Sequence, residues 1–92
     1  MLIVIGALGE SESSALKLQD FVADGERFIP VFSDKAHFAA EAKGTGYEDQ
    51  GIEIDRKLLA SILKGDEVLV LNPGTVRRRI GKRDLQADKP LL

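Results

Sequence analysis

The chain has 92 residues, of which 43% are hydrophobic and 30% are charged, and this composition is typical of one globular domain rather than a disordered segment. A formal net charge of -2 excludes a strong overall field for nucleic acid or membranes, and the lack of cysteine excludes disulfides, thiol catalysis and thiolate metal sites. The apolar run at residues 2–8 is too short to span a membrane and follows no basic residue, so we expect a cytoplasmic protein without membrane contact.

The first quarter of the chain predicts β-structure, with one ambiguous segment. Residues 2–5 are β-branched or leucine and are bounded by glycine, which predicts a strand. Residues 11–25 fit either a helix behind serine caps or an alternating strand. The turn Ala23-Asp24-Gly25-Glu26 is typical of a β-hairpin and favours the strand.

Pro30 lies inside the next apolar run, residues 28–32. Proline has no amide hydrogen to donate, so we expect this strand at a sheet edge or with the missing amide facing outward. An exposed edge can pair with another chain. Phe28, Pro30 and Phe32 are therefore candidates for contact with a partner protein or a second copy of this chain.

A helix is expected after this strand, because either Ser33 or Asp34 can cap one and apolar residues follow at helical spacing. His37 is the only histidine, and one imidazole cannot form a multi-histidine zinc site. It could act as a general base beside Asp34 or Glu41, although a surface histidine at a helix start is the simpler interpretation. We expect neither a metal nor a cofactor.

The second half of the chain predicts a surface loop at residues 45–51, a short strand at 52–54 and a helix from about Asp55 to Gly65. The four consecutive apolar residues 68–71 predict a central strand that is covered on both faces. Asn72-Pro73-Gly74 must then form a turn, because proline fixes φ and glycine accepts a positive φ.

Both apolar runs, 28–32 and 68–71, end at polar turns. Ligands bind at crevices beyond strand ends in many α/β sheets. The turns therefore predict a small-ligand or anion site, whose candidate residues are Ser33, Asp34, Asn72, Gly74 and Thr75. Helix capping and turn geometry explain the same residues without any ligand.

Five cations fall within seven residues near the end of the chain: Arg77, Arg78, Arg79, Lys82 and Arg83. Arginine suits bidentate contacts with phosphates or with an acidic partner. The cluster lacks interleaved aromatic residues for base stacking. We therefore favour a solvated or partner-facing surface over a nucleic-acid site.

Five segments in order carry a family resemblance: residues 14–19 (Ser-Ala-Leu-Lys-Leu-Gln), Asp24-Gly25, residues 29–33 (Ile-Pro-Val-Phe-Ser), the apolar helix at 58–63 and residues 68–74. In these segments the chain resembles the N-terminal domain of the SseB family, bacterial enhanced serine sensitivity proteins that are associated by name with type III secretion. The resemblance implies an α+β fold with a mixed, mostly antiparallel sheet of about four to five strands and two main helices. It implies no established activity.

These observations predict a single α+β domain over residues 1–86 and a frayed tail over residues 87–92. We expect a non-enzymatic protein-interaction module, because no catalytic constellation is present. A small-ligand or anion-binding domain is the alternative, and weak nucleic-acid binding through the Arg77 to Arg83 cluster is the third interpretation.

Overall fold

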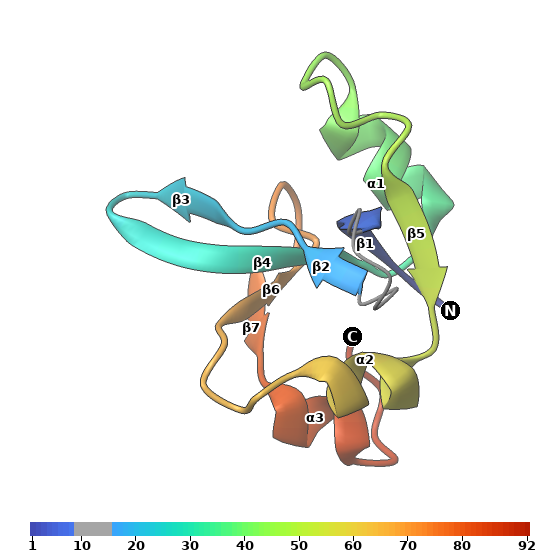
Figure 1. The fold of residues 1–92 in the computed structure, drawn as a ribbon, viewed down its shortest axis with the longest axis vertical. Helices are drawn as coiled ribbons and strands as arrows, with labels where there is room; N and C mark the ends of the chain where they lie inside the picture. Colours follow the sequence, from blue (N-terminus) through green and yellow to red (C-terminus); the bar gives the residue numbers. More distant parts are fainter. Residues whose placement is uncertain (9–15) are drawn as a thin grey trace.

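The computed structural model describes residues 1–8 and 16–92, which form one mixed sheet with three short helices (Figure 1). The helices are α1 (Lys35–Ala42), α2 (Arg56–Ile62) and α3 (Lys82–Gln86). The strands are β1 (Leu2–Leu8), β2 (Leu16–Leu18), β3 (Phe21–Ala23), β4 (Glu26–Phe32), β5 (Gly51–Ile54), β6 (Leu69–Leu71) and β7 (Arg78–Ile80).

The α+β class is confirmed, and so is the predominance of antiparallel pairing, because β4 with β6 is the parallel pair in the described sheet. The described residues hold seven strands instead of four to five, and three helices instead of two. The strand count is higher because the strand expected before Asp24-Gly25 is divided into β2 and β3, and because β7 was not expected. β7 has three residues and α3 has five, which is too little periodicity to be recognised in a sequence.

The strand that contains Pro30 is interior, which corrects the expectation of a sheet edge. β4 pairs with β1 at Ile3 and Val4 and with β6 along its other side. The amide of Ile29 donates to Val68 and the carbonyl of Val31 accepts from Asn72, so the residues flanking Pro30 form the ladder with β6. The Pro30 nitrogen therefore faces the β1 side, where the β1–β4 ladder has ended. Phe28, Pro30 and Phe32 therefore do not lie along a free sheet edge, and their contact with a partner or a second copy of this chain stays a prediction.

Residues 16–23 continue the sheet where β1 and β4 separate. β2 pairs antiparallel with the second half of β1, and the amide of Gln19 donates to the carbonyl of Ile5. β3 pairs with β4 in the predicted hairpin, which extends away from the rest of the molecule in Figure 1. Its turn has φ of 54° at Asp24 and 78° at Gly25, values that Asp and Gly accept. The strand interpretation is confirmed for residues 16–18 and 21–22, whereas residues 11–15 lie outside the described residues.

The two faces of the sheet carry two separate cores, because neighbouring residues of a strand point to opposite faces. On one face α2 and α3 pack against the sheet, with Leu59, Leu63, Leu69, Leu71 and Leu85 buried. On the other face α1 packs against the sheet through Phe38 and Ala42, which contact Ile3, Ile5 and Phe32. We refer to this second face as the α1 face.

The tail beyond α3 contacts the domain in this structure, and the fraying of residues 87–92 stays a prediction. The Arg56 guanidinium donates to the carbonyls of Ala87 and Lys89, at 2.8 and 2.9 Å. Leu91 packs against the core under α2 and α3. Residues 87–92 are therefore attached at two points.

Gly51 packs closely against α1, so a substitution there tests the packing of the α1 face. A Cβ atom at this position would lie 2.6 Å from Cε2 of Phe38, whose ring packs edge-on against Phe32 at 5.4 Å between centroids. The Phe38 ring is buried, so it cannot move away at low cost. We expect Gly51→Ala to lower the free energy of unfolding by about 1–3 kcal/mol in urea denaturation.

A Phe38→Leu background is the control for this prediction, because it removes the ring that the new methyl group would strike. The additional cost of Gly51→Ala should fall there, giving a coupling between the two sites. An unchanged cost in both backgrounds would show that the effect comes from the backbone and not from the ring.

Candidate binding site

The turns that follow Phe32 and Leu71 lie against each other. The Asn72 Oδ1 atom accepts from the Ser33 amide at 3.0 Å, and the Asn72 Nδ2 atom donates to the Ser33 Oγ atom at 3.0 Å. Asn72 is fully buried and has a φ of 47°, a conformation that asparagine accepts more readily than most residues. Its carbonyl accepts from the amides of Thr75 and Arg77.

Gly74 connects this pair of turns to α1. Its amide donates to the Oε1 atom of Glu41, and a Cβ atom on Gly74 would lie 2.8 Å from that oxygen. Glycine is therefore needed for the close approach of the carboxyl group. We call Ser33, Glu41, Asn72 and Gly74 the turn junction.

The turn junction brings together three of the five residues predicted to form a ligand site, namely Ser33, Asn72 and Gly74. Thr75 is exposed, and its amide donates to the carbonyl of Asn72 within the turn. Ser33 and Asn72 contact each other, and Glu41 Oε1 contacts the Gly74 amide, so these contacts hold the two turns together and attach them to α1. The role of the predicted residues as ligand contacts stays a prediction.

Asp34, the fifth predicted site residue, caps α1. Its Oδ1 atom accepts from the His37 amide at 2.8 Å and lies 2.8 Å from the His37 Nδ1 atom. The Ser33 Oγ atom approaches the same Nδ1 atom at 3.4 Å. A Ser-His-Asp relay requires the acid and the hydroxyl on opposite ring nitrogens. The arrangement is a helix cap and does not have the geometry of a relay.

The Asp34 cap should make the stability of α1 depend on pH. The His37 amide, followed by the His37 side chain, lowers the pKa of Asp34 below its ordinary value. A carboxyl group with a lowered pKa in the folded state stabilises the fold above its unfolded-state pKa, and this contribution is lost as the pH falls through the folded-state pKa. We expect NMR titration to give Asp34 a pKa below the usual aspartate value, and α1 to lose stability in acid.

Asp34→Asn is the control, since asparagine caps a helix without titrating in this range. Amide exchange in α1 should then be less sensitive to acid than in the wild type. An ordinary Asp34 pKa, or equal acid sensitivity in both proteins, would contradict the role of the cap.

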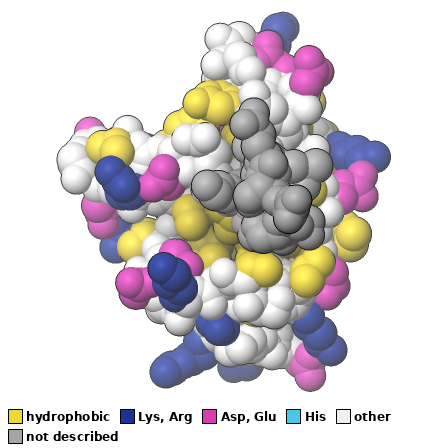
Figure 2. Space-filling model, viewed as in Figure 1, with side chains coloured by type: hydrophobic (Ala, Val, Ile, Leu, Met, Phe, Trp, Pro, Cys, Tyr) yellow, Lys and Arg dark blue, Asp and Glu magenta, His cyan; other side chains and the backbone are white. Residues whose placement is uncertain are grey.

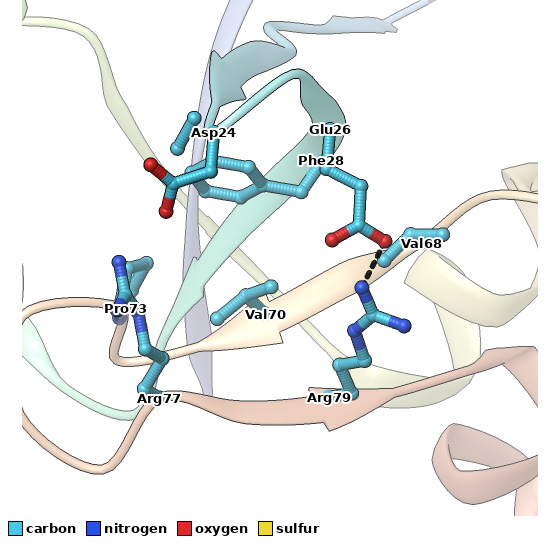
Figure 3. A pocket seen from close by; sticks show the side chains of 9 residues that line it. Asp24, Glu26, Phe28, Val68, Val70, Pro73, Arg77 and Arg79 are labelled. Atoms are coloured by element: carbon cyan, nitrogen blue, oxygen red, sulfur yellow. Dashed lines mark hydrogen bonds and ion pairs between the residues drawn. The ribbon is translucent and has the colours of Figure 1, made fainter.

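Two hollows lie beside the turn junction, on the part of the α1 face that borders Phe28 and Pro73. The first, which we call the arginine pocket, has a volume of about 350 Å³ (Figure 3). Phe28, Val68 and Val70 form its apolar floor. Asp24 and Arg77 lie at one end, and Glu26 and Arg79 form an ion pair at the other (Figure 3).

The second hollow, the aromatic pocket, has a volume of about 260 Å³, and its lining includes Phe21, Phe28, Pro30, Phe32, Glu41 and Tyr47. The ring of Phe21 packs edge-on against Tyr47 at 5.3 Å and tilted against Phe28 at 6.4 Å. The Glu41 Oε2 atom is buried and has no hydrogen-bond partner among the described residues. An unpaired oxygen of this kind is costly, and few occur in folded proteins.

The two pockets share Phe28 and Pro73, and together we call them the groove. The groove corrects one expectation about β6. Leu69 and Leu71 are fully buried, but Val68 and Val70 are half-buried and line the arginine pocket. The strand is thus covered fully on one face only, and Figure 2 shows hydrophobic side chains at the surface near the base of the hairpin.

The five predicted basic residues do not share one surface. Arg78 and Arg79 are neighbours on β7 and point to opposite faces of the sheet. Arg79 pairs with Glu26, and the Lys82 Nζ atom donates to the carbonyl of Leu63 at 3.0 Å. Arg77 lines the groove, and Arg83 is exposed on α3.

Sequence reasoning missed Phe21, Glu41 and Tyr47. Glu41 is a charged residue in a short helix, which normally indicates a solvated position. Tyr47 lies in a glycine-rich loop without periodicity. Their proximity depends on how α1 and β3 approach β4, and a single sequence gave no signal of that approach.

Within the part of the chain that the structure describes, no helix is both long and apolar enough to cross a membrane. Searches of curated proteins and of solved structures found no match. The family model for the SseB protein N-terminal domain matches residues 2–80, which include all the strands that the structure describes and the two longer helices. The chain therefore belongs to the SseB N-terminal domain family.

Proposed function

We propose that this domain is a non-enzymatic interaction module that binds a segment of a partner protein in the groove. One observation carries the proposal: Phe28 of β4, Val70 of β6 and Val68, the residue just before β6, form a half-buried apolar surface. Valine and phenylalanine at interior strands of a sheet are normally covered. Here the helix on this face covers Ile3, Ile5 and Phe32 instead.

The composition of the groove supports a protein partner. Interface centres are apolar and rich in aromatic residues and arginine, and their rims are polar. The groove has an apolar floor and four phenylalanine or tyrosine side chains, and its rim holds Asp24, Glu26, Arg77 and Arg79. The two hollows meet at Phe28 and Pro73, so an extended segment could occupy both.

A test of this proposal uses Val70→Lys, which projects a charged side chain into the groove, and Ile62→Lys as its matched control. Ile62 is 39% exposed on α2, which packs on the opposite face of the sheet. We expect the wild type and Ile62→Lys to capture the same partner from a native extract, and Val70→Lys to lose it. Thermal melts must show that both variants fold. Equal capture by all three proteins would contradict the proposal.

The second candidate is a small-ligand or anion site. The arginine pocket favours it, because a volume of about 350 Å³ falls within the range of small-molecule sites, roughly 300–1,000 Å³. Arg77 and Arg79 would supply the contacts to an anion. A thermal-shift panel of nucleotides, amino acids and inorganic phosphate should then raise the melting temperature, and Arg77→Gln should reduce the shift.

The cellular setting is also part of the proposal. The family name supports a bacterial protein with a link to type III secretion, and the composition supports a cytoplasmic location. Nucleic-acid binding is the least favoured function, because the cations are divided between two faces and two of them are engaged with Glu26 and Leu63.

A further inference from the structure

The Glu41 carboxyl group is the least satisfied polar group of the groove. Its Oε1 atom accepts from the Gly74 amide, whereas Oε2 is buried without a hydrogen-bond partner among the described residues. A buried acceptor that lacks a donor destabilises the fold, because it has lost its hydrogen bonds to water and gained none from the protein. A ligand that donates a hydrogen bond to Oε2 would remove this destabilisation. Glu41 therefore indicates that a ligand of the aromatic pocket carries a hydrogen-bond donor.

We propose that the aromatic pocket binds a lysine side chain of the partner protein, with the lysine ammonium group donating to Glu41 Oε2. This inference rests on the proposed function, and it assigns the residue type that anchors the partner. Charge complementarity supports it, because a carboxyl group stands at the wall of a pocket whose other lining is mostly apolar and aromatic. The faces of Phe and Tyr rings attract a cation, and the apolar lining matches the lysine methylene chain.

The geometry favours lysine over arginine. A guanidinium group binds a carboxylate best through two parallel hydrogen bonds, which need both oxygens. The Gly74 amide already donates to Oε1, so among the described residues only Oε2 remains without a donor. A single ammonium group is suited to one free oxygen. The volume of about 260 Å³ is below the usual size of a drug-sized ligand site and matches one side chain.

Binding includes a small local rearrangement, because Oε2 has almost no contact with solvent in this structure. Rotamer changes of interface side chains are common when partners bind. Tyr47 is a half-buried side chain of the same pocket wall, from the loop that follows α1. The resonances of Tyr47 should therefore respond to a ligand together with those of Glu41.

The test is an NMR titration of the full chain with the peptide Gly-Gly-Lys-Gly-Gly. We expect shifts at Phe21, Glu41 and Tyr47, and at least fivefold weaker binding when the peptide carries norleucine, Nε-acetyl-lysine or arginine in place of lysine. Glu41→Gln should weaken binding of the lysine peptide at least fivefold, whereas Asp49→Asn, at an exposed position of the loop that follows α1, should not. Failure of the lysine peptide to shift the pocket, or equal binding of the norleucine peptide, would overturn the lysine assignment.

Two further outcomes separate this inference from the proposed function. If n-butylamine binds as tightly as the lysine peptide, the site serves free amines and the assignment to a protein lysine is wrong. If partner capture is lost in Val70→Lys but unchanged in Glu41→Gln, the groove binds a protein and the lysine anchor is wrong. Loss of capture in both variants, with retention in Asp49→Asn, is the result that the inference requires.

Discussion

Asn72→Ala is expected to lower the free energy of unfolding by about 3–5 kcal/mol. The substitution removes both hydrogen bonds to Ser33 and leaves the Ser33 amide without its acceptor, and each such loss costs about 1–3 kcal/mol. It also places alanine at a φ of 47°, where a Cβ atom adds about 1 kcal/mol of strain. Folded domains have about 5–15 kcal/mol in total, so this single change removes a large fraction. Urea denaturation measures it.

Two companion variants separate the contributions at this position. Asn72→Gly loses the same hydrogen bonds but accepts a positive φ, so we expect it to be about 1 kcal/mol more stable than Asn72→Ala. Ser33→Ala keeps the Ser33 amide bonded to Asn72 Oδ1 and removes the hydroxyl alone, so its cost should be about 1–2 kcal/mol. A loss below about 1 kcal/mol in Asn72→Ala would show that other contacts hold the two turns together.

Asn72 illustrates why the sequence predicted much of this fold. Turn residues report on the local backbone, so Asn72-Pro73-Gly74, Asp24-Gly25 and the Asp34 cap could be placed without knowledge of tertiary structure. Alternation and apolar runs likewise indicated the main strands and the helix that Asp55 caps. The prediction that the turns after β4 and β6 meet came from a different source, the tendency of α/β sheets to form crevices beyond their strand ends.

The position of Pro30 in the sheet could not be predicted from local sequence signals alone. A missing amide is compatible with an edge strand or with a gap between two ladders, and the choice depends on where β1 and β3 stop pairing with β4. The apolar run of β6 has the same limitation, because a covered strand and a strand that forms a groove floor carry the same residues. The aromatic pocket is a product of tertiary packing, and so it could not be predicted from periodicity.

Arg56 carries the second large expected effect, because its guanidinium joins α2 to α3 and to the tail. It donates to the carbonyls of Asp84, Leu85, Ala87 and Lys89. The last carbonyls of a helix have no partner within the helix, so a cation there satisfies them and interacts favourably with the helix dipole. We expect Arg56→Ala to lower the free energy of unfolding by about 2–4 kcal/mol and to speed amide exchange in α3.

Arg56→Lys tests whether the stabilisation by Arg56 comes from the geometry of its hydrogen bonds or from its charge. Lysine retains the charge, but one ammonium group cannot reach four carbonyls, so it should recover less than half of the loss. Lys57→Ala is the matched control: its side chain is exposed on the same helix, and its removal should change the free energy by less than about 0.5 kcal/mol. Full rescue by lysine would show that the charge alone stabilises the end of α3, and that the four directed hydrogen bonds contribute little.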